Sequence, residues 1–164
     1  MEQVVVSGIA YSQKEARVTV RGIPDRPGIA ARLFEALAAA GISVDMIVQS
    51  VGAGGHASLS FTVPETDLAA ARETVAGLKE EMAIGAIEVD PATAKISIVG
   101  LGMQSHTGVA ARMFETLRAE GINILMISTS EIRISCIIAR DQMERAVRAL
   151  HAAFHLENAP AEEG

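Results

Sequence analysis

Aromatic residues are scarce in this sequence, and tryptophan is absent. Only 3% of the residues are Phe, Trp or Tyr, so few side chains could stack on nucleic-acid bases. Basic residues are also outnumbered, with 14 Lys and Arg against 20 Asp and Glu, and the formal net charge of −6 repels phosphate backbones. We therefore expect no nucleic acid among the partners of this chain.

Cysteine and long apolar runs are the other absences. A single cysteine, Cys136, excludes an internal disulfide, and its setting in "RISCIIA" is typical of a buried strand thiol and not of a nucleophile. No apolar run approaches the roughly 20 residues of a membrane span. The start, "MEQVVVSGIAYSQKEARV", also lacks the basic region of a signal peptide. We expect a globular, cytoplasmic protein with no membrane partner.

The sequence contains an internal repeat. Residues 29–50 align without a gap with residues 109–130, and the two segments share Ala, Arg, Phe, Leu, Gly and Met at matching positions. Apolar residues four apart in each segment predict one buried helical face. Gly41 and Gly121 stand where a helix ends in a left-handed residue. The duplication favours two small domains.

Strand and helix patterns extend the repeat on both sides. Copy one runs from the strand "VTVRG" through the first helix and a second strand to the strand "HASLSFTV", the helix "ETDLAAARETVAGLKEEM" and a closing strand, "AIGAIEVD". This βαββαβ order predicts an α+β, ferredoxin-like fold, in which both helices cover one face of a four-stranded sheet.

Copy two lacks a closing strand. Its last helix, "DQMERAVRALHAAF", runs into the polar "HLENAPAEEG", whereas the chain begins with a strand, "QVVVSGIAY", that copy one does not need. We infer that this N-terminal strand completes the second sheet. The predicted domains are residues 17–93 and residues 94–157 together with 1–16, followed by a frayed tail at 158–164.

The turn before the first helix of each copy is the best candidate for a ligand site. A helix N-terminus presents unpaired N–H donors and roughly half a positive charge, which suits a carboxylate or a phosphate. In copy one this turn reads "IPDRPG". A purely structural interpretation also fits, with Asp25 as a helix cap and Pro27 where the helix begins.

The stretch "DRPGIAARLFEALAAAGISV" resembles the ligand-loop signature of the ACT domain, a small βαββαβ module that binds amino acids in regulatory proteins. The segments "GIPDRPGIAARLFEAL", "GMQSHTGVAARMFETL" and "NILMISTSEIRISCII" are similar to the tandem ACT region of aspartate kinases, and the likeness covers nearly the whole chain. No segment resembles the "KFGG"-type nucleotide segment of the kinase part. The resemblance implies a separate regulatory (beta) subunit or an excised regulatory domain, without catalysis of its own.

The resemblance also implies partners. In the family, paired ACT domains lie side by side, two chains associate face to face, and the end products threonine and lysine inhibit the enzyme. We therefore expect a homodimer that binds a catalytic (alpha) kinase subunit and mediates feedback inhibition of aspartate-family amino-acid synthesis. The expected effector is threonine, bound between the two ACT domains, and whether lysine acts with it stays open.

A zwitterionic amino acid needs donors for its carboxylate and an acceptor for its ammonium group. N–H groups of the helix start can supply the donors, Asp25 can pair with the ammonium, and Gln49 can reach a side-chain hydroxyl. The family's matching positions extend this site to the second strand of copy two. The predicted threonine-binding residues are Asp25, Pro27, Gly28, Ile29, Ala30, Gln49, Asn123 and Ile124.

Copy two departs from this pattern. Its turn, "MQSHTG", has no acid at the position of Asp25, so an ammonium partner is missing. In the family, this region borders either a second effector position or the contact with the kinase, and both alternatives stay open here. The residues concerned are Ser105, His106, Thr107, Gly108, Val109, Ala110, Ser128, Thr129, Ser130 and Glu131.

Other functions remain as alternatives. The chain could be a ligand-independent dimerisation or assembly module of a kinase, or another ACT-type amino-acid sensor. A small enzyme is disfavoured because no paired carboxylates, Cys/His couple or metal cluster recurs at a plausible spacing. His151 and His155 are spaced for one helical face, but no further ligands converge in the sequence, so we expect neither a metal nor a cofactor.

Overall fold

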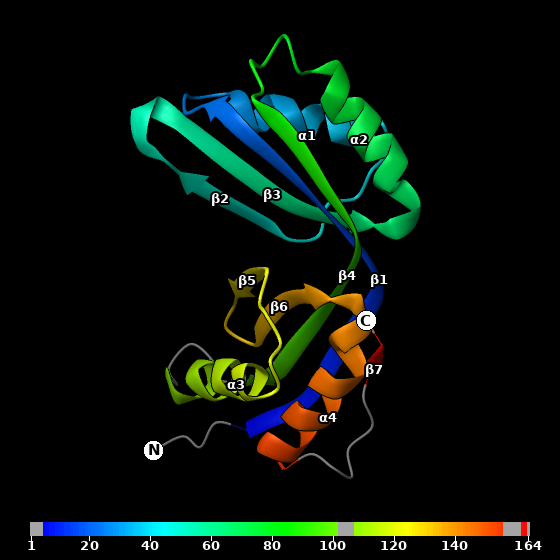
Figure 1. Cartoon of the computed structure of the whole chain (residues 1–164), viewed down its shortest axis with the longest axis vertical. Coiled ribbons are helices and arrows are strands. Elements are labelled where there is room, and N and C mark those ends of the chain that lie inside the picture. The colour runs from blue at the N-terminus through cyan, green and yellow to red at the C-terminus, as the bar shows by residue number, and fades with distance from the viewer. Residues whose placement is uncertain (1–4, 102–106, 156–161, 164) are drawn as a thin grey trace. The chain divides into compact units, whose positions relative to one another are not determined.

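The structure, a computed structural model, describes residues 5–101, 107–155 and 162–163, and it divides into two compact units (Figure 1). We call Lys14–Pro91 domain 1, and Met1–Gln13 together with Ala92–Gly164 domain 2. The chain passes between the units at residues 13–14 and 91–92, beside the predicted boundaries at 16–17 and 93–94.

Domain 1 follows the predicted βαββαβ order. Its strands neighbour one another in the order β2-β3-β1-β4, and β3 is antiparallel to both β1 and β2. Both helices lie on the same face of this sheet (Figure 1). The elements are the second part of β1 (Val5–Pro24), α1 (Ile29–Ala39), β2 (Ile47–Val51), the 3-10 turn η1 (Ala53–Gly55), β3 (His56–Pro64), the 3-10 turn η2 (Glu65–Asp67), α2 (Leu68–Gly77) and the first part of β4 (Ala86–Leu101).

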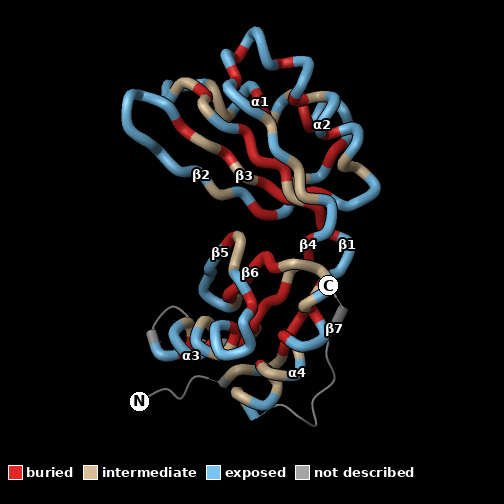
Figure 2. Tube along the Cα trace, in the orientation of Figure 1, coloured by how far each residue is buried: buried red, intermediate tan, exposed pale blue. Residues whose placement is uncertain are grey.

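The core of domain 1 lies between the helices and the sheet. On the face of β3 that the helices cover, every second residue from Ala57 to Val63 is buried, because successive strand side chains point to opposite faces (Figure 2). Thr62, on the other face, is also buried. Leu33 and Leu37 of α1 pack into this core. Phe34 meets Phe61 of β3 edge to face, with 5.8 Å between the ring centroids.

Domain 2 has the same layout, but its sheet uses the start of the chain. Its strands follow the order β1-β4-β6-β5, with β7 beside β1. The elements are the first part of β1, the second part of β4, α3 (Thr107–Ala119), β5 (Met126–Thr129), β6 (Arg133–Ala139), the 3-10 turn η4 (Arg140–Gln142), α4 (Met143–Ala153) and β7 (Glu162–Glu163).

The N-terminal strand completes the second sheet, which confirms the prediction. Ile9 is 1% exposed and belongs to the same core as Ile96 and Ile98 of β4. The Ser7 hydroxyl donates a hydrogen bond to the Val99 carbonyl at 3.1 Å. One difference concerns continuity, because the N-terminal strand and the first strand of copy one form the single strand β1.

The predicted frayed tail, residues 158–164, lies mostly outside the described residues. Glu162 and Glu163 form β7, which pairs in parallel with Ala10 and Tyr11 of β1. Within the part of the chain that the structure describes, no helix has both the length and the apolar character needed to cross a membrane.

Left-handed residues end the first helix of each domain, as predicted. Gly41 has φ +74° and Gly121 has φ +69°. In both cases the glycine N–H bonds to a carbonyl three residues back, and the next N–H bonds to one five residues back, which satisfies carbonyls at the helix end. A side chain at either position would be strained, since L residues rarely adopt a positive φ.

Cys136 lies fully buried in β6, which confirms the interpretation of a buried strand thiol. Burial in an apolar setting disfavours the thiolate and raises the pKa of the Cys136 thiol from 9.0 to about 12.

This shift predicts a loss of stability at alkaline pH. A raised folded pKa contributes stability that is complete below the unfolded pKa and is lost as the pH rises toward 12, by up to about 1.4 kcal/mol per pH unit. Urea unfolding of the wild type and of Cys136→Ala from pH 7 to 10.5 checks this, because the variant has no thiol. Equal pH slopes for the two proteins would contradict the prediction.

Candidate functional site

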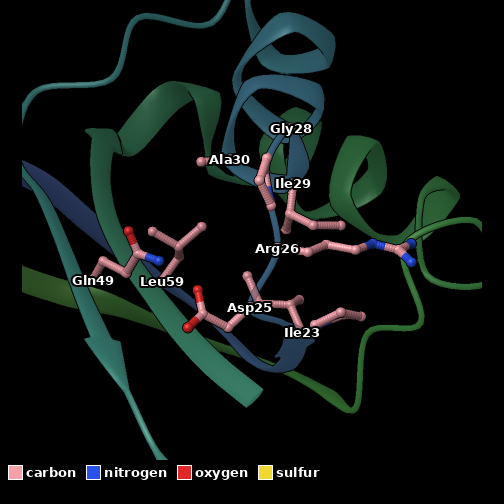
Figure 3. A pocket seen from close by; sticks show the side chains of 10 residues that line it. Ile23, Asp25, Arg26, Gly28, Ile29, Ala30, Gln49 and Leu59 are labelled. Atoms are coloured by element: carbon pink, nitrogen blue, oxygen red, sulfur yellow. The ribbon is translucent and has the colours of Figure 1, made fainter. Parts of the chain in front are cut away.

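A pocket of about 390 Å³ opens in domain 1 between the end of β1, the start of α1 and strands β2 and β3 (Figure 3). Six of the eight residues predicted to bind threonine line it. The lining residues are Ile23, Pro24, Asp25, Arg26, Pro27, Gly28, Ile29, Ala30, Gln49 and Leu59. We call residues Pro24–Gly28 the ligand loop.

A bulge at the end of β1 leads the chain into the ligand loop. From Val20 to Ile23 the chain of β1 advances three residues, whereas its partner strand β3 advances only two, so β1 has one extra residue here. Gly22 within this bulge has φ +69°. An extra residue of this kind bends a strand and redirects the residues after it, and glycine adopts the left-handed conformation without strain. The Asp25 N–H then donates to the Gly55 carbonyl at 2.9 Å, which holds the loop beside η1.

Helix α1 begins without a side-chain cap. Gly28 is its N-cap residue, with φ +91°, and it has no side chain that could accept a hydrogen bond from the helix. The interpretation of Asp25 as a helix cap is therefore wrong. The first intrahelical hydrogen bond runs from the Arg32 N–H to the Gly28 carbonyl at 3.0 Å. The N–H of Ala30 comes before this bond in the helix, so it is a donor at the helix start that a ligand can use.

The polar side chains of the pocket come from two elements. Asp25 on the ligand loop and Gln49 on β2 extend toward the same space, whereas the guanidinium of Arg26 points away from both (Figure 3). Among the residues that the structure describes, neither the Asp25 carboxylate nor the Gln49 amide has a side-chain hydrogen bond or ion pair. Both groups are exposed and available to a ligand.

Two residues of the pocket's apolar wall, Ile23 and Leu59, were not predicted, whereas Ile29 was. Ile23 and Leu59 are each 1% exposed and belong to the domain core, while Ile29 is partly buried. Leu59 pairs with Gln49 across β2 and β3, so the two side chains lie on the same face of the sheet. The register of these strands places Leu59 in the pocket, and no sequence pattern specifies that register.

The other predicted residues belong to domain 2, outside the pocket lining. Asn123 is exposed, and Ile124 is half-buried and packs against the core of domain 2. Ser105 and His106 lie outside the described residues. Thr107 begins α3, followed by Gly108, while Val109 is 8% exposed in the core and Ala110 packs against it. Ser128 and Thr129 are exposed on β5, and Ser130 and Glu131 are exposed in the turn to β6.

The arrangement in domain 1 suits a small zwitterion. N–H groups at a helix start favour an anion, an unpaired carboxylate favours a cation, and a nearby amide can donate or accept a further hydrogen bond. In a comparison with family models, the model of the ACT domain matches residues 18–77 and 96–154. The chain belongs to the ACT domain family.

The relatives of this ACT protein are aspartate kinases. It is 49% identical over 168 residues to an aspartokinase of Pseudomonas aeruginosa, and 49% identical over 158 residues to one of Helicobacter pylori. These matches cover 100% and 96% of the chain but only 40% and 38% of the two relatives, respectively. The chain thus spans about two fifths of their length.

Solved structures of regulatory subunits match over their whole length. A chain in the crystal structure of aspartokinase alpha and beta subunits is 47% identical, with a TM-score of 0.87, and the match covers 93% of this chain and 100% of that one. The ligand-free regulatory subunit of aspartate kinase from Thermus thermophilus is 43% identical, with a TM-score of 0.86, and the match covers 91% and 98%. This chain therefore corresponds to the regulatory, ACT-containing part of aspartate kinase.

Proposed function

We propose that this chain senses threonine through the pocket of domain 1 and passes the bound state to the catalytic subunit of an aspartate kinase. The observation that supports it most is the set of polar groups around the pocket. The exposed Asp25 carboxylate and the Gln49 amide have no side-chain partner among the described residues, and the start of α1 lies beside them. They match the ammonium, the hydroxyl and the carboxylate of threonine, respectively.

The resemblance to aspartate kinases extends this proposal. Asn123 and Ile124 of domain 2 are further threonine contacts, an assignment that rests on the resemblance alone. The chain acts in the cytoplasm, and threonine, alone or with lysine, inhibits synthesis of the aspartate family of amino acids through it. Allostery of this kind requires the ligand to favour one of two arrangements, with a coupling of about 1 to 3 kcal/mol.

The exposed edge of domain 1 supports self-association. Ile47 and Val51 on β2 are 49% and 65% exposed, and β2 ends the strand order of its sheet. Edge strands with exposed apolar side chains are usually paired or protected. We propose a homodimer through the ACT domains. If the role were assembly alone, the dimer would form without any effect of threonine on stability or on the kinase.

A thermal-shift screen of free amino acids tests the effector. At a hundredfold excess over its dissociation constant, threonine is expected to stabilise the protein by about 2.7 kcal/mol. Valine, which has a methyl group in place of the hydroxyl, is the matched ligand and should stabilise it less, because the site's polar group would lose a partner. No stabilisation by threonine at millimolar concentration would rule out this effector.

A further inference from the structure

One segment of domain 1 contacts the chain just before and just after the ligand loop. Leu78–Gly85 joins α2 to β4, and three of its side chains, Leu78, Met82 and Ile84, are buried in the core of domain 1. Its last turn is closed by bonds from Ala83 N–H to the Glu80 carbonyl and from Ile84 N–H to the Lys79 carbonyl. Buried side chains and closed hydrogen bonds make this segment a fixed support.

The first contact lies just before the ligand loop. The Gly85 N–H donates to the Arg21 carbonyl at 2.9 Å. The backbones approach so closely that a Cβ built on Gly85 would lie 3.1 Å from the Arg21 carbonyl oxygen and 3.4 Å from the Gly22 Cα. Only glycine fits here without displacing the bulge of β1, from which the ligand loop departs.

The second contact lies just after the ligand loop. Arg32 Nε lies 3.3 Å from Oε1 and 3.2 Å from Oε2 of Glu81, which ties the first turn of α1 to the same segment. The Arg32 N–H makes the first intrahelical bond, to Gly28, so this side chain stands on the same helical turn as the Ala30 N–H. The pair is about half exposed, and its individual contribution is small.

We propose that Gly85 and Glu81 are positioning residues for the ligand loop, a role that rests on the pocket being the effector site. A loop that must become ordered on binding loses affinity, whereas a loop held in the bound conformation does not. The loop's own backbone bonds include one from Asp25 to η1. The two contacts with Leu78–Gly85 hold its ends and keep Asp25 and the helix N–H groups at a fixed separation.

Two variants and a matched control test this role. Gly85→Ala adds one methyl group at the close approach, and Glu81→Gln removes one carboxylate. Glu80→Gln removes the same charge from the neighbouring residue, whose side chain has no hydrogen bond or ion pair among the described residues. Calorimetric titration with threonine is expected to give a dissociation constant raised about tenfold in Gly85→Ala and about two- to fivefold in Glu81→Gln, with no change in Glu80→Gln. The double exchange of Arg32→Glu with Glu81→Arg should recover most of the affinity.

Hydrogen exchange measured without ligand tests the positioning role independently of which effector the pocket binds. The backbone amides in residues 23–30, where Pro24 and Pro27 have none, are expected to exchange faster in Gly85→Ala and Glu81→Gln than in the wild type or Glu80→Gln. If threonine does not bind the wild type but exchange accelerates, the effector is wrong and the positioning role stands. Unchanged exchange of residues 23–30 in both variants would overturn the positioning role, and Glu81→Gln keeps this test available because its surface change leaves the core intact.

Discussion

Replacing Asp25 with asparagine is expected to weaken threonine binding by about tenfold. Hydrogen bonds to charged groups contribute about 1.5 to 3 kcal/mol, and solvent at an exposed site reduces that amount. Asparagine has nearly the same size but cannot neutralise an ammonium group. Since the carboxylate has no side-chain partner among the described residues, the variant loses no native contact, and its stability without ligand should equal that of the wild type.

Calorimetric titration of Asp25→Asn against threonine measures this effect. Glu35→Gln is the matched control, because Glu35 lies exposed on α1 outside the pocket lining and its replacement changes the net charge equally. A weaker affinity in both variants would point to the overall field of an acidic chain and not to a specific contact. An unchanged affinity in Asp25→Asn would remove Asp25 from the site and, with it, the main argument for an amino-acid ligand in this pocket.

The fold was predictable from the sequence because local patterns and the repeat agreed. Apolar residues four apart in α1, with Gly41 after its end, specify both the helix and its termination. The same pattern in α3, with Gly121, made the duplication visible and assigned two βαββαβ units. The second unit lacked one strand and the first had one too many, so the N-terminal strand was assigned to the second sheet, where it lies beside β4.

The continuity of the long strands was not predictable. The segment "SQKEAR" is polar, as a connection between strands would be, yet β1 runs through it, since it contains neither glycine nor proline to interrupt a strand. In β4, Pro91 favours a break, but the strand continues past it. Polarity alone did not mark solvent exposure here, since Ser12 and Glu15 are buried, and it does not distinguish a linker from a strand.

The candidate site was predictable only where it is contiguous. The ligand loop and the start of α1 supply most of the pocket, and their proximity follows from chain connectivity. Leu59 comes from β3, and its place beside Gln49 depends on strand register, which a single sequence specifies weakly. The close approach of Gly85 to Gly22 was not predictable for the same reason, because the two residues are far apart in the sequence and only the folded sheet and the turn after α2 bring them together.

Truncating Ile9 to alanine is expected to destabilise domain 2 by about 2 to 5 kcal/mol, the range for large-to-small changes in a packed core. Ile9 is 1% exposed and packs with β4 residues, although it lies more than eighty residues away in sequence. Deleting Met1–Tyr11 should have a larger effect, because it also removes the strand that pairs with the second part of β4 and leaves that edge open. Gly8→Ala should change little, since a Cβ at Gly8 meets no heavy atom within 4 Å.

Cys136 gives a direct readout of which domain opens. It is the only cysteine in the chain and lies buried on β6 of domain 2, so a thiol reagent reacts when domain 2 unfolds locally. Labelling in Ile9→Ala should be faster than in the wild type by a factor that matches the loss of stability. Leu33→Ala, an equivalent truncation in the core of domain 1, should lower the melting temperature without accelerating the labelling. Equal acceleration in both variants would mean that the two domains unfold together, and that the N-terminal strand does not stabilise domain 2 selectively.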